Sequence, residues 1–253
     1  MKHFYLLICL TLLGTAHAQT TNDTIFFWKA GVMLDKRSIK PIDLDSITFK
    51  RPVIITNVTI CTQVWANRNL EVTTYSDGTP IPQVTDPTAW AALTTGAWCY
   101  YNNNATNGTT YGKLYNWYAA VGIHSAASLT NVALRKKLAP TGWHVPTDAE
   151  WTTLTTCLGG EIVAGGKMKA TGTTHWFSPN TAATNSSGFT GLPGGFRYND
   201  GSFNYIDYYG FWWSSSENDS ASAWNRNLNY NNGNAYRYFY NKNYGYSVRC
   251  LRD

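Results

Sequence analysis

The chain has 253 residues, of which 14% are charged and 15% aromatic, and its formal net charge is +5. The charged fraction lies well below the roughly 25% of an average soluble protein, and the densest basic run is Arg135-Lys136-Lys137. These values argue against a nucleic-acid-binding protein, which concentrates Lys and Arg on one face. They favour a surface for neutral polar partners such as sugars.

Residues 1–18 have the pattern of a secretory signal peptide. Lys2 and His3 precede an apolar run at 4–13, which is too short to span a bilayer, and the small residues Ala16 and Ala18 fit the cleavage rule. We expect a mature chain from Gln19 that is secreted or held in the cell envelope, with no membrane insertion after cleavage.

Residues 19–52 predict an N-terminal β-hairpin leader that ends in a short strand at 46–49. The remaining residues, 53–253, predict one large domain. Its first element is a strand pair over 53–64.

Short helices are predicted next. Asp86 followed by Pro87 is a typical helix N-terminus, and apolar residues at i, i+3, i+4 and i+7 predict a helix over 113–121. The best-specified helix begins at Thr147, which can form a capping box with Glu150.

The second half is rich in Gly, Asn, Ser and Trp. Its large apolar side chains are predicted core anchors: Trp176, Phe189, Leu192, Phe196, Trp212 and Trp213. Antiparallel strands are predicted over 223–230, 235–240 and 245–251. The predicted class is α+β: loop-rich, with a small twisted antiparallel sheet and a few short helices.

Asparagines and aromatics nearly alternate over 224–246, a composition typical of contact surfaces. Strand alternation puts the odd-numbered asparagines opposite Leu228, so we expect them to face solvent beside a tyrosine row in the next strand. Alternatively, the tyrosine row closes the core. The candidate ligand-binding residues are Trp224, Asn225, Asn227, Asn229, Asn231, Tyr236, Tyr238, Tyr240 and Tyr244.

Catalytic signals are weak, and we expect no catalytic residue. Ser214, Ser215 and Ser216 lack a nucleophile-elbow motif, and His144 is interpreted as structural, although His144 or His175 could serve a hydrolase as base. The carboxylates cannot be paired from sequence as a glycosidase requires; they include Asp148, Glu150, Glu161, Asp200, Asp207 and Glu217.

We expect no resident cofactor or metal. Two oxygen-rich groups are candidate calcium ligands, although Asx-turns would explain both. They are Glu217, Asn218 and Asp219, and Asn199, Asp200 and Asp207.

Several long motifs resemble the Fibrobacter succinogenes major paralogous domain over 53–253. They are YSDGTPIPQV (75–84), TTGAWCYYNN (94–103), YGKLYNWYA (111–119), TGWHVPTDAEWTTLTTCLGG (141–160), ATNSSGFTGLPGGFRYNDGSF (183–203), FWWSSSE (211–217) and YSVRCLRD (246–253). The leader resembles a segment found on secreted Bacteroidetes-type proteins of this kind. The resemblance implies a C-type-lectin-like fold, related to the formylglycine-generating enzymes. That oxidase branch needs a nearby cysteine pair for copper, a pattern missing here.

Four cysteines follow the signal peptide, and they allow three pairings: Cys61, Cys99, Cys157 and Cys250. Relatives often have Gly near Cys61 and an aromatic residue near Cys157, whereas cysteine is usual at the other two positions. The resemblance therefore implies a Cys61–Cys157 disulfide, with Cys99–Cys250 as the remaining pair.

Relatives also tend to have asparagine where this chain has Tyr236, Tyr238, Phe239 and Tyr240. Adenine-directed changes convert Asn codons to Tyr, which suggests a diversified face; drift in a solvated hairpin is the alternative. We expect an exported, non-catalytic domain that binds a carbohydrate or a protein surface. The runner-up is a structural or adhesion component of the cell envelope, and the third reading is an oxidase or hydrolase.

Overall fold

A computed structural model describes residues 23–29, 32–39 and 55–253. The chain divides into two compact units, Met1–Pro52 and Val53–Asp253. In the first unit, β1 (Asp23–Lys29) and β2 (Val32–Ile39) pair antiparallel, with a register shift between Phe27 and Trp28. The predicted signal peptide and the strand at 46–49 lie outside the described residues.

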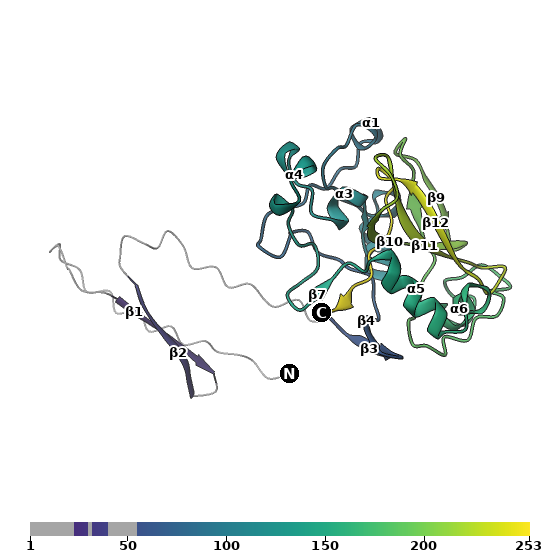
Figure 1. Ribbon diagram of the computed structural model, residues 1–253, viewed down its shortest axis with the longest axis horizontal. Coiled ribbons are helices and arrows are strands. Elements are labelled where there is room, and N and C mark those ends of the chain that lie inside the picture. The colour runs from purple at the N-terminus through teal and green to yellow at the C-terminus, as the bar shows by residue number, and fades with distance from the viewer. Residues whose placement is uncertain (1–22, 30–31, 40–54) are drawn as a thin grey trace. The chain divides into compact units, whose positions relative to one another are not determined.

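A five-stranded sheet dominates the second unit (Figure 1). Its strands are β8 (Gly194–Arg197), β9 (Phe203–Ile206), β10 (Tyr209–Glu217), β11 (Ser222–Asn229) and β12 (Ala235–Asn241). They lie in the order β12-β11-β10-β8-β9, and all neighbours are antiparallel except β10 and β8. The strand β12 therefore forms one edge of this sheet.

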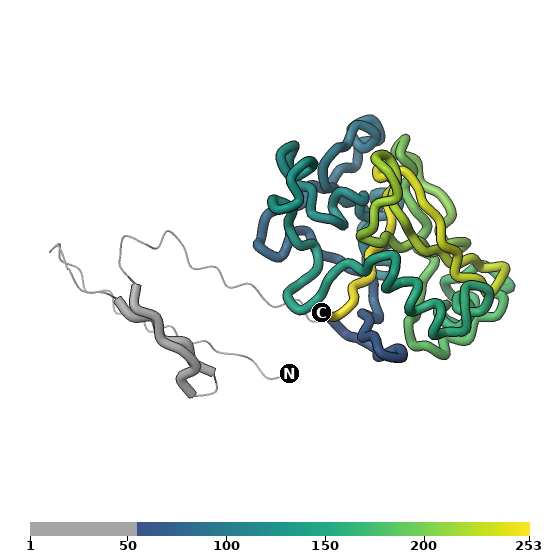
Figure 2. Tube along the Cα trace, in the orientation of Figure 1, coloured from purple at the N-terminus to yellow at the C-terminus, as the bar shows by residue number. Residues whose placement is uncertain are grey.

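A four-stranded sheet joins the start of the domain to its end. In spatial order its strands are β3 (Asn57–Ile60), β4 (Gln63–Ala66), β13 (Leu251–Arg252) and β7 (Trp143–His144). Figure 2 shows the C-terminal segment returning to these early strands. A smaller pair consists of β5 (Trp98–Cys99) and β6 (Leu114–Tyr115).

The helices are short, and the loops between them are long. They are α1 (Pro87–Ala91), α2 (Ala105–Tyr111), α3 (Trp117–Ala120), α4 (Ala126–Thr130), α5 (Asp148–Cys157) and α6 (Glu161–Met168), with 3-10 turns η2 (Tyr101–Asn103) and η3 (Val132–Leu134). Within the described ranges, no helix is long and apolar enough to cross a membrane. The observed architecture is the predicted loop-rich α+β class.

Locally encoded helix starts are confirmed. Asp86 caps α1, and Thr147 and Glu150 form the expected capping box of α5. The predicted helix over 113–121 is wrong in its first half, because residues 114–115 form β6. Asn116 then caps the four-residue α3 and also accepts a hydrogen bond from the Ala97 N–H.

The strand predicted over 245–251 is also wrong. Tyr246 and Ser247 make only isolated bridges, to Tyr115 and Trp212, and the chain then leaves the large sheet. Leu251 pairs with both β4 and β7. This departure arises from long-range pairing, which the local pattern does not encode.

A hydrophobic cluster lies on each face of the five-stranded sheet. Trp213 and Phe211 pack on one side with Tyr246, whereas Trp212 and Leu228 pack on the other side with residues of α5 and α6. Successive strand residues point to opposite faces, so the pair Trp212-Trp213 anchors both clusters. Of the predicted anchors, Leu192 is only partly buried.

Cations inside the domain connect loops through backbone carbonyls. Arg197 is fully buried and donates to the carbonyl oxygens of Val84, Thr85 and Gly201. Lys169 is equally buried, and its Nζ donates to three carbonyls, those of Thr181, Asn229 and Asn232, at 2.7–2.8 Å. These bonds satisfy carbonyls that loops would otherwise bury unpaired.

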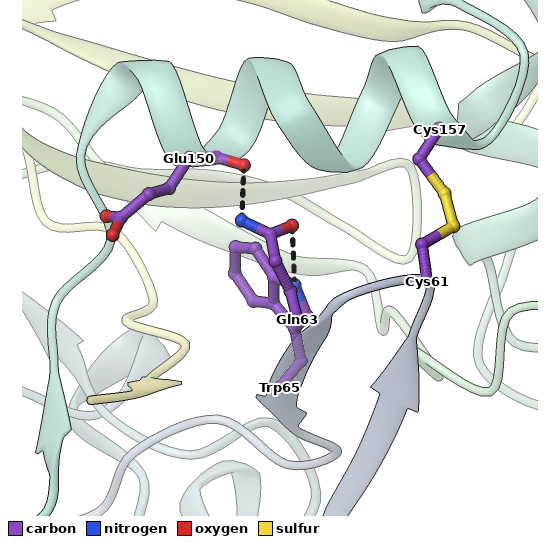
Figure 3. The surroundings of a disulfide bond; sticks show 5 residues. All are labelled: Cys61, Gln63, Trp65, Glu150 and Cys157. Carbon is purple, nitrogen blue, oxygen red and sulfur yellow. Dashed lines mark hydrogen bonds between the residues drawn. A yellow bond between two sulfur atoms is a disulfide. The ribbon is translucent and has the colours of Figure 1, made fainter.

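A disulfide joins Cys61, in the turn between β3 and β4, to Cys157, the last residue of α5 (Figure 3). A hydrogen bond also joins β4 to α5, because the Gln63 amide donates to the Glu150 carbonyl. Gln63 in turn accepts from the indole N–H of Trp65. The predicted Cys61–Cys157 pair is therefore confirmed.

The predicted Cys99–Cys250 pair is wrong, because both thiols are free and buried. Cys99 packs in a cluster with Trp90 and Leu114. Cys250 belongs instead to the cluster around Tyr246. Burial raises the pKa of each thiol to about 12, so both are neutral at physiological pH.

Candidate ligand-binding face

The register of the large sheet places three asparagines between two aromatic rows. Asn225 and Asn227 of β11 lie opposite Tyr238 and Tyr236 of β12. On their other side, Asn227 and Asn229 lie opposite Phe211 and Tyr209 of β10. Directly opposed residues share a face of the sheet, so amides and rings form one surface.

Tyrosine rings run in a row along β12 and beyond it. Tyr236, Tyr238 and Tyr240 have ring centroids 6.0 and 6.2 Å apart. Tyr244 lies 5.4 Å from Tyr240, and Tyr198 lies 5.4 Å from Tyr244. The β-strand period of two aligns the three β12 rings, and Tyr244 and Tyr198 extend this ladder of phenol groups beyond the strand.

A second row comes from β9 and β10, and the sequence analysis did not include it among the candidates. Tyr209 stacks on Phe211 at 5.7 Å and lies 5.2 Å from Tyr205. The alternation of Tyr209, Phe211 and Trp213 in the sequence was the signal for this row. We call the combined surface the aromatic face; it consists of Asn225, Asn227, Asn229, Tyr198, Tyr205, Tyr209, Tyr236, Tyr238, Tyr240 and Tyr244.

The expectation that the asparagine row faces solvent is wrong. Asn225, Asn227 and Asn229 are 0%, 4% and 7% exposed. They are covered because β11 is an interior strand, with large rings on both sides. The outermost rings are open, since Tyr238 and Tyr205 are each 49% exposed. The tyrosine row therefore both borders the core and reaches solvent.

Polar groups within this surface have unused hydrogen-bonding capacity. Asn225 donates to the Tyr238 carbonyl at 3.0 Å, but its Oδ1 has no partner, and neither does the buried Tyr246 hydroxyl beneath the ladder. Unpaired buried polar groups cost about 1–3 kcal/mol each, so they call for an explanation.

The aromatic face is electrically neutral. All ten of its residues are Asn or Tyr, and burial raises the pKa values of Tyr209, Tyr240 and Tyr244 above that of a free phenol. These three phenols therefore keep their protons at neutral pH, and a phenol hydroxyl can both donate and accept. Such a surface suits a partner with many hydroxyl groups and no charge.

Tyr205 has a strained backbone within this surface. Its φ is 65°, a left-handed conformation that is unusual for a bulky side chain. This conformation accompanies a stack of the Tyr205 ring on Phe196, at 5.8 Å. Strain of this kind is concentrated at functional sites.

Two predicted ligand-binding residues lie off the aromatic face. Trp224 points to the opposite side of β11, where it contacts Phe239 and the Arg237 guanidinium. Its neighbour Asn225 faces the other way, because side chains alternate along a strand. Asn231 lies in the turn after β11, where its Oδ1 accepts from the Asn232 amide.

A polar cavity of about 500 Å³ lies elsewhere in the domain, and its lining includes Arg249, Asn69 and His175. The Arg249 guanidinium donates to Asn69 Oδ1 and to the carbonyls of Ala66 and Phe189. The guanidinium therefore uses its hydrogen bonds within the domain and not for a ligand. The aromatic face is therefore the stronger candidate site.

The candidate catalytic groups make structural contacts. His144 lies between Glu150 and Asp253, at 3.0 and 2.8 Å, and His175 packs edge-on against Tyr111. Four other candidate carboxylates have partners of their own. Asp148 contacts Arg226 and Arg237, Asp207 accepts from Tyr111, Asp200 accepts from Ser202, and Glu217 pairs with Lys242. Glu161 is the first residue of α6.

The candidate calcium ligands include two turn-forming carboxylates. Asp219 accepts from the N–H groups of Ala221 and Ser222, and Asp200 accepts from the Ser202 N–H. Among the described residues, no group of three or more His, Cys, Asp or Glu side chains is placed to hold a metal ion.

The fold and this surface define an α+β domain with an open aromatic sheet face. A comparison with family models matches residues 58–252 to the Fibrobacter succinogenes major domain. The chain therefore belongs to that family. No curated protein and no solved structure matches the chain, so the relationship to C-type lectins and formylglycine-generating enzymes remains a prediction.

Proposed function

We propose that this domain is an exported, non-catalytic binding module that recognises neutral carbohydrate through the aromatic face. The carrying observation is the row of tyrosine rings along β12, whose member Tyr238 is 49% exposed, beside a second row that ends in the equally exposed Tyr205. Tyrosine rings offer flat apolar area with a polar tip. The hydroxyl groups of the exposed rings both donate and accept, as sugar hydroxyls require.

The openness of the surface supports an extended partner. Tyr238 and Tyr205 are half-exposed, and the ladder from Tyr236 to Tyr198 follows β12 and continues beyond its end. A flat row of rings suits several units of a chain better than one enclosed monosaccharide. The signal-peptide pattern would deliver such a module to the cell envelope or the exterior.

The test is a glycan array, followed by calorimetry with soluble oligosaccharides so that multivalency does not contribute. Tyr238→Ser should weaken binding at least tenfold, because it removes an exposed ring from the ladder. Phe239→Ser is a matched control: Phe239 is the next residue of β12, is 50% exposed, and points to the opposite face.

The proposal fails if the parent binds no glycan, or if both serine variants bind as the parent does. A parent that binds no glycan but captures a defined host protein, with the same dependence on Tyr238, would assign the face to protein recognition. A folded parent that binds neither would favour a structural or adhesive component.

A further inference from the structure

We propose that β12 is a docking edge for a second copy of this chain, which pairs with it antiparallel and joins two five-stranded sheets into one. The proposal is independent of the carbohydrate function. It rests on the free hydrogen-bonding groups of β12, on the position of its one charge, and on the self-complementarity of its sequence.

The first observation is the direction of the backbone groups. The Lys242 N–H donates to the Ala221 carbonyl at 3.0 Å, so these opposite residues form a hydrogen-bonded pair. In an antiparallel ladder every second pair is hydrogen-bonded. It follows that Tyr236, Tyr238 and Tyr240 direct their backbone groups toward β11. Arg237 and Phe239 direct theirs to the open edge, where they form no hydrogen bond with the described residues.

The second observation is that this edge lacks the usual protection. Natural edge strands are blunted by charged side chains, Pro, bulges or a covering helix or loop. The seven residues AYRYFYN contain no Pro or Lys, and their register with β11 is regular. The one charged side chain, Arg237, is held against Asp148 and the Trp224 ring, 3.3 Å from its centroid.

The third observation is self-complementarity. A two-fold axis through Tyr238 would place each Arg237 opposite Phe239 of the other copy, so that their outward groups form four hydrogen bonds. An axis at Arg237 would oppose two guanidinium groups. An axis at Phe239 would pair Arg237 with Asn241 of the other copy. That pair would need the Asn241 carbonyl, which already accepts from the Tyr244 N–H.

The axis through Tyr238 also unites the two tyrosine ladders. A two-fold axis normal to the sheet keeps each side chain on its own face, so Tyr236 of one copy meets Tyr240 of the other. The short edge implies modest affinity, and we expect monomers at about 1 µM and dimers at about 1 mM. An identical strand fits this register, because each Arg237 then lies opposite Phe239 and not opposite another guanidinium.

Sedimentation of the chain from Gln19 tests the association. Phe239→Pro removes one outward N–H and leaves the bonds to β11 intact, as edge proline does; Phe239→Ala removes the same ring but keeps the N–H. We expect the alanine variant to dimerise and the proline variant to stay monomeric, both with the parent's circular dichroism. A parent that is monomeric at 1 mM, or a folded proline variant that dimerises like the alanine variant, would overturn the proposal.

Tyr238→Cys tests the register without relying on proline. At the axis, two such residues form a non-hydrogen-bonded pair with Cα atoms about 4.5 Å apart, within disulfide range. Air oxidation should give a covalent dimer. Asn241→Cys on the same strand should not, and equal cross-linking of both variants would rule out the proposed register. Oligosaccharide calorimetry on the proline variant is a separate readout, so the two proposals can fail independently.

Discussion

Single side chains hold distant loops together, and Asn69 is the clearest case. Its Oδ1 accepts from the Trp212 indole N–H and from two nitrogens of Arg249, and its amide donates to the Tyr111 carbonyl and to Ser247. One amide therefore connects four segments that are far apart in the chain.

Asn69→Ala should lower the free energy of unfolding by about 3 kcal/mol, because it leaves a buried guanidinium and an indole N–H without their acceptor. Asn67→Ala is the control, since Asn67 accepts only an exposed hydrogen bond from Thr56. Urea denaturation measures both. Equal midpoints for the two variants would contradict the role given to Asn69.

The Asp219 carboxylate gives a pH dependence. Its pKa is lowered to about 2, mainly by the Ser222 hydroxyl and the N–H groups of the turn after β10. A lowered folded pKa stabilises the fold above the unfolded value, near 4, and this stabilisation disappears as pH falls toward 2. The thermal midpoint of the parent should therefore fall faster over pH 4–2 than that of Asp219→Asn. Parallel curves would be evidence against this linkage.

Between elements, the disulfide is the covalent tie. Cys61 and Cys157 are 96 residues apart, so their bond restricts a long loop of the unfolded chain. Replacing both by Ala should lower the free energy of unfolding by about 4 kcal/mol. Reductant should shift the denaturation midpoint of the parent and leave that of the double variant unchanged; an unshifted parent would show that the bond contributes little.

Elements with local signals were predictable, and those that depend on distant contacts were not. Thr147 and Glu150 encode the start of α5 within four residues. The segment 113–121 has helical periodicity, yet Leu114 lies in the strand β6, where it pairs with Cys99 of β5. Its structure is decided by a strand elsewhere in the sequence.

The same distinction explains which parts of the candidate site could be predicted from the sequence. Alternation correctly placed Asn225, Asn227 and Asn229 on one face and the β12 tyrosines on one face. It could not show that β11 lies inside a sheet, so the burial of the asparagines was missed. Tyr205 and Tyr198 reach the face through the pairing of β8 with β10, which has no local pattern.

For the whole domain, closure depends on its last residues. Leu251 is 4% exposed and pairs with Trp65 and His144, so it holds the first strands of the domain to the middle of the chain. Deleting residues 251–253 should lower the free energy of unfolding by about 3 kcal/mol through lost burial and pairing. Removing Asp253 alone, an exposed partner of His144, is the control. Denaturation midpoints that match the parent's would refute this role.

The buried cations have a consequence for how the domain tolerates substitution. Arg197 and Lys169 hold their loops through the carbonyls of residues such as Val84, Thr181 and Asn232. Every amino acid supplies a carbonyl, so the side chains at these anchor points can change without loss of the bond. A scaffold fixed in this way lets its loops diverge in sequence while the frame beneath them keeps its shape.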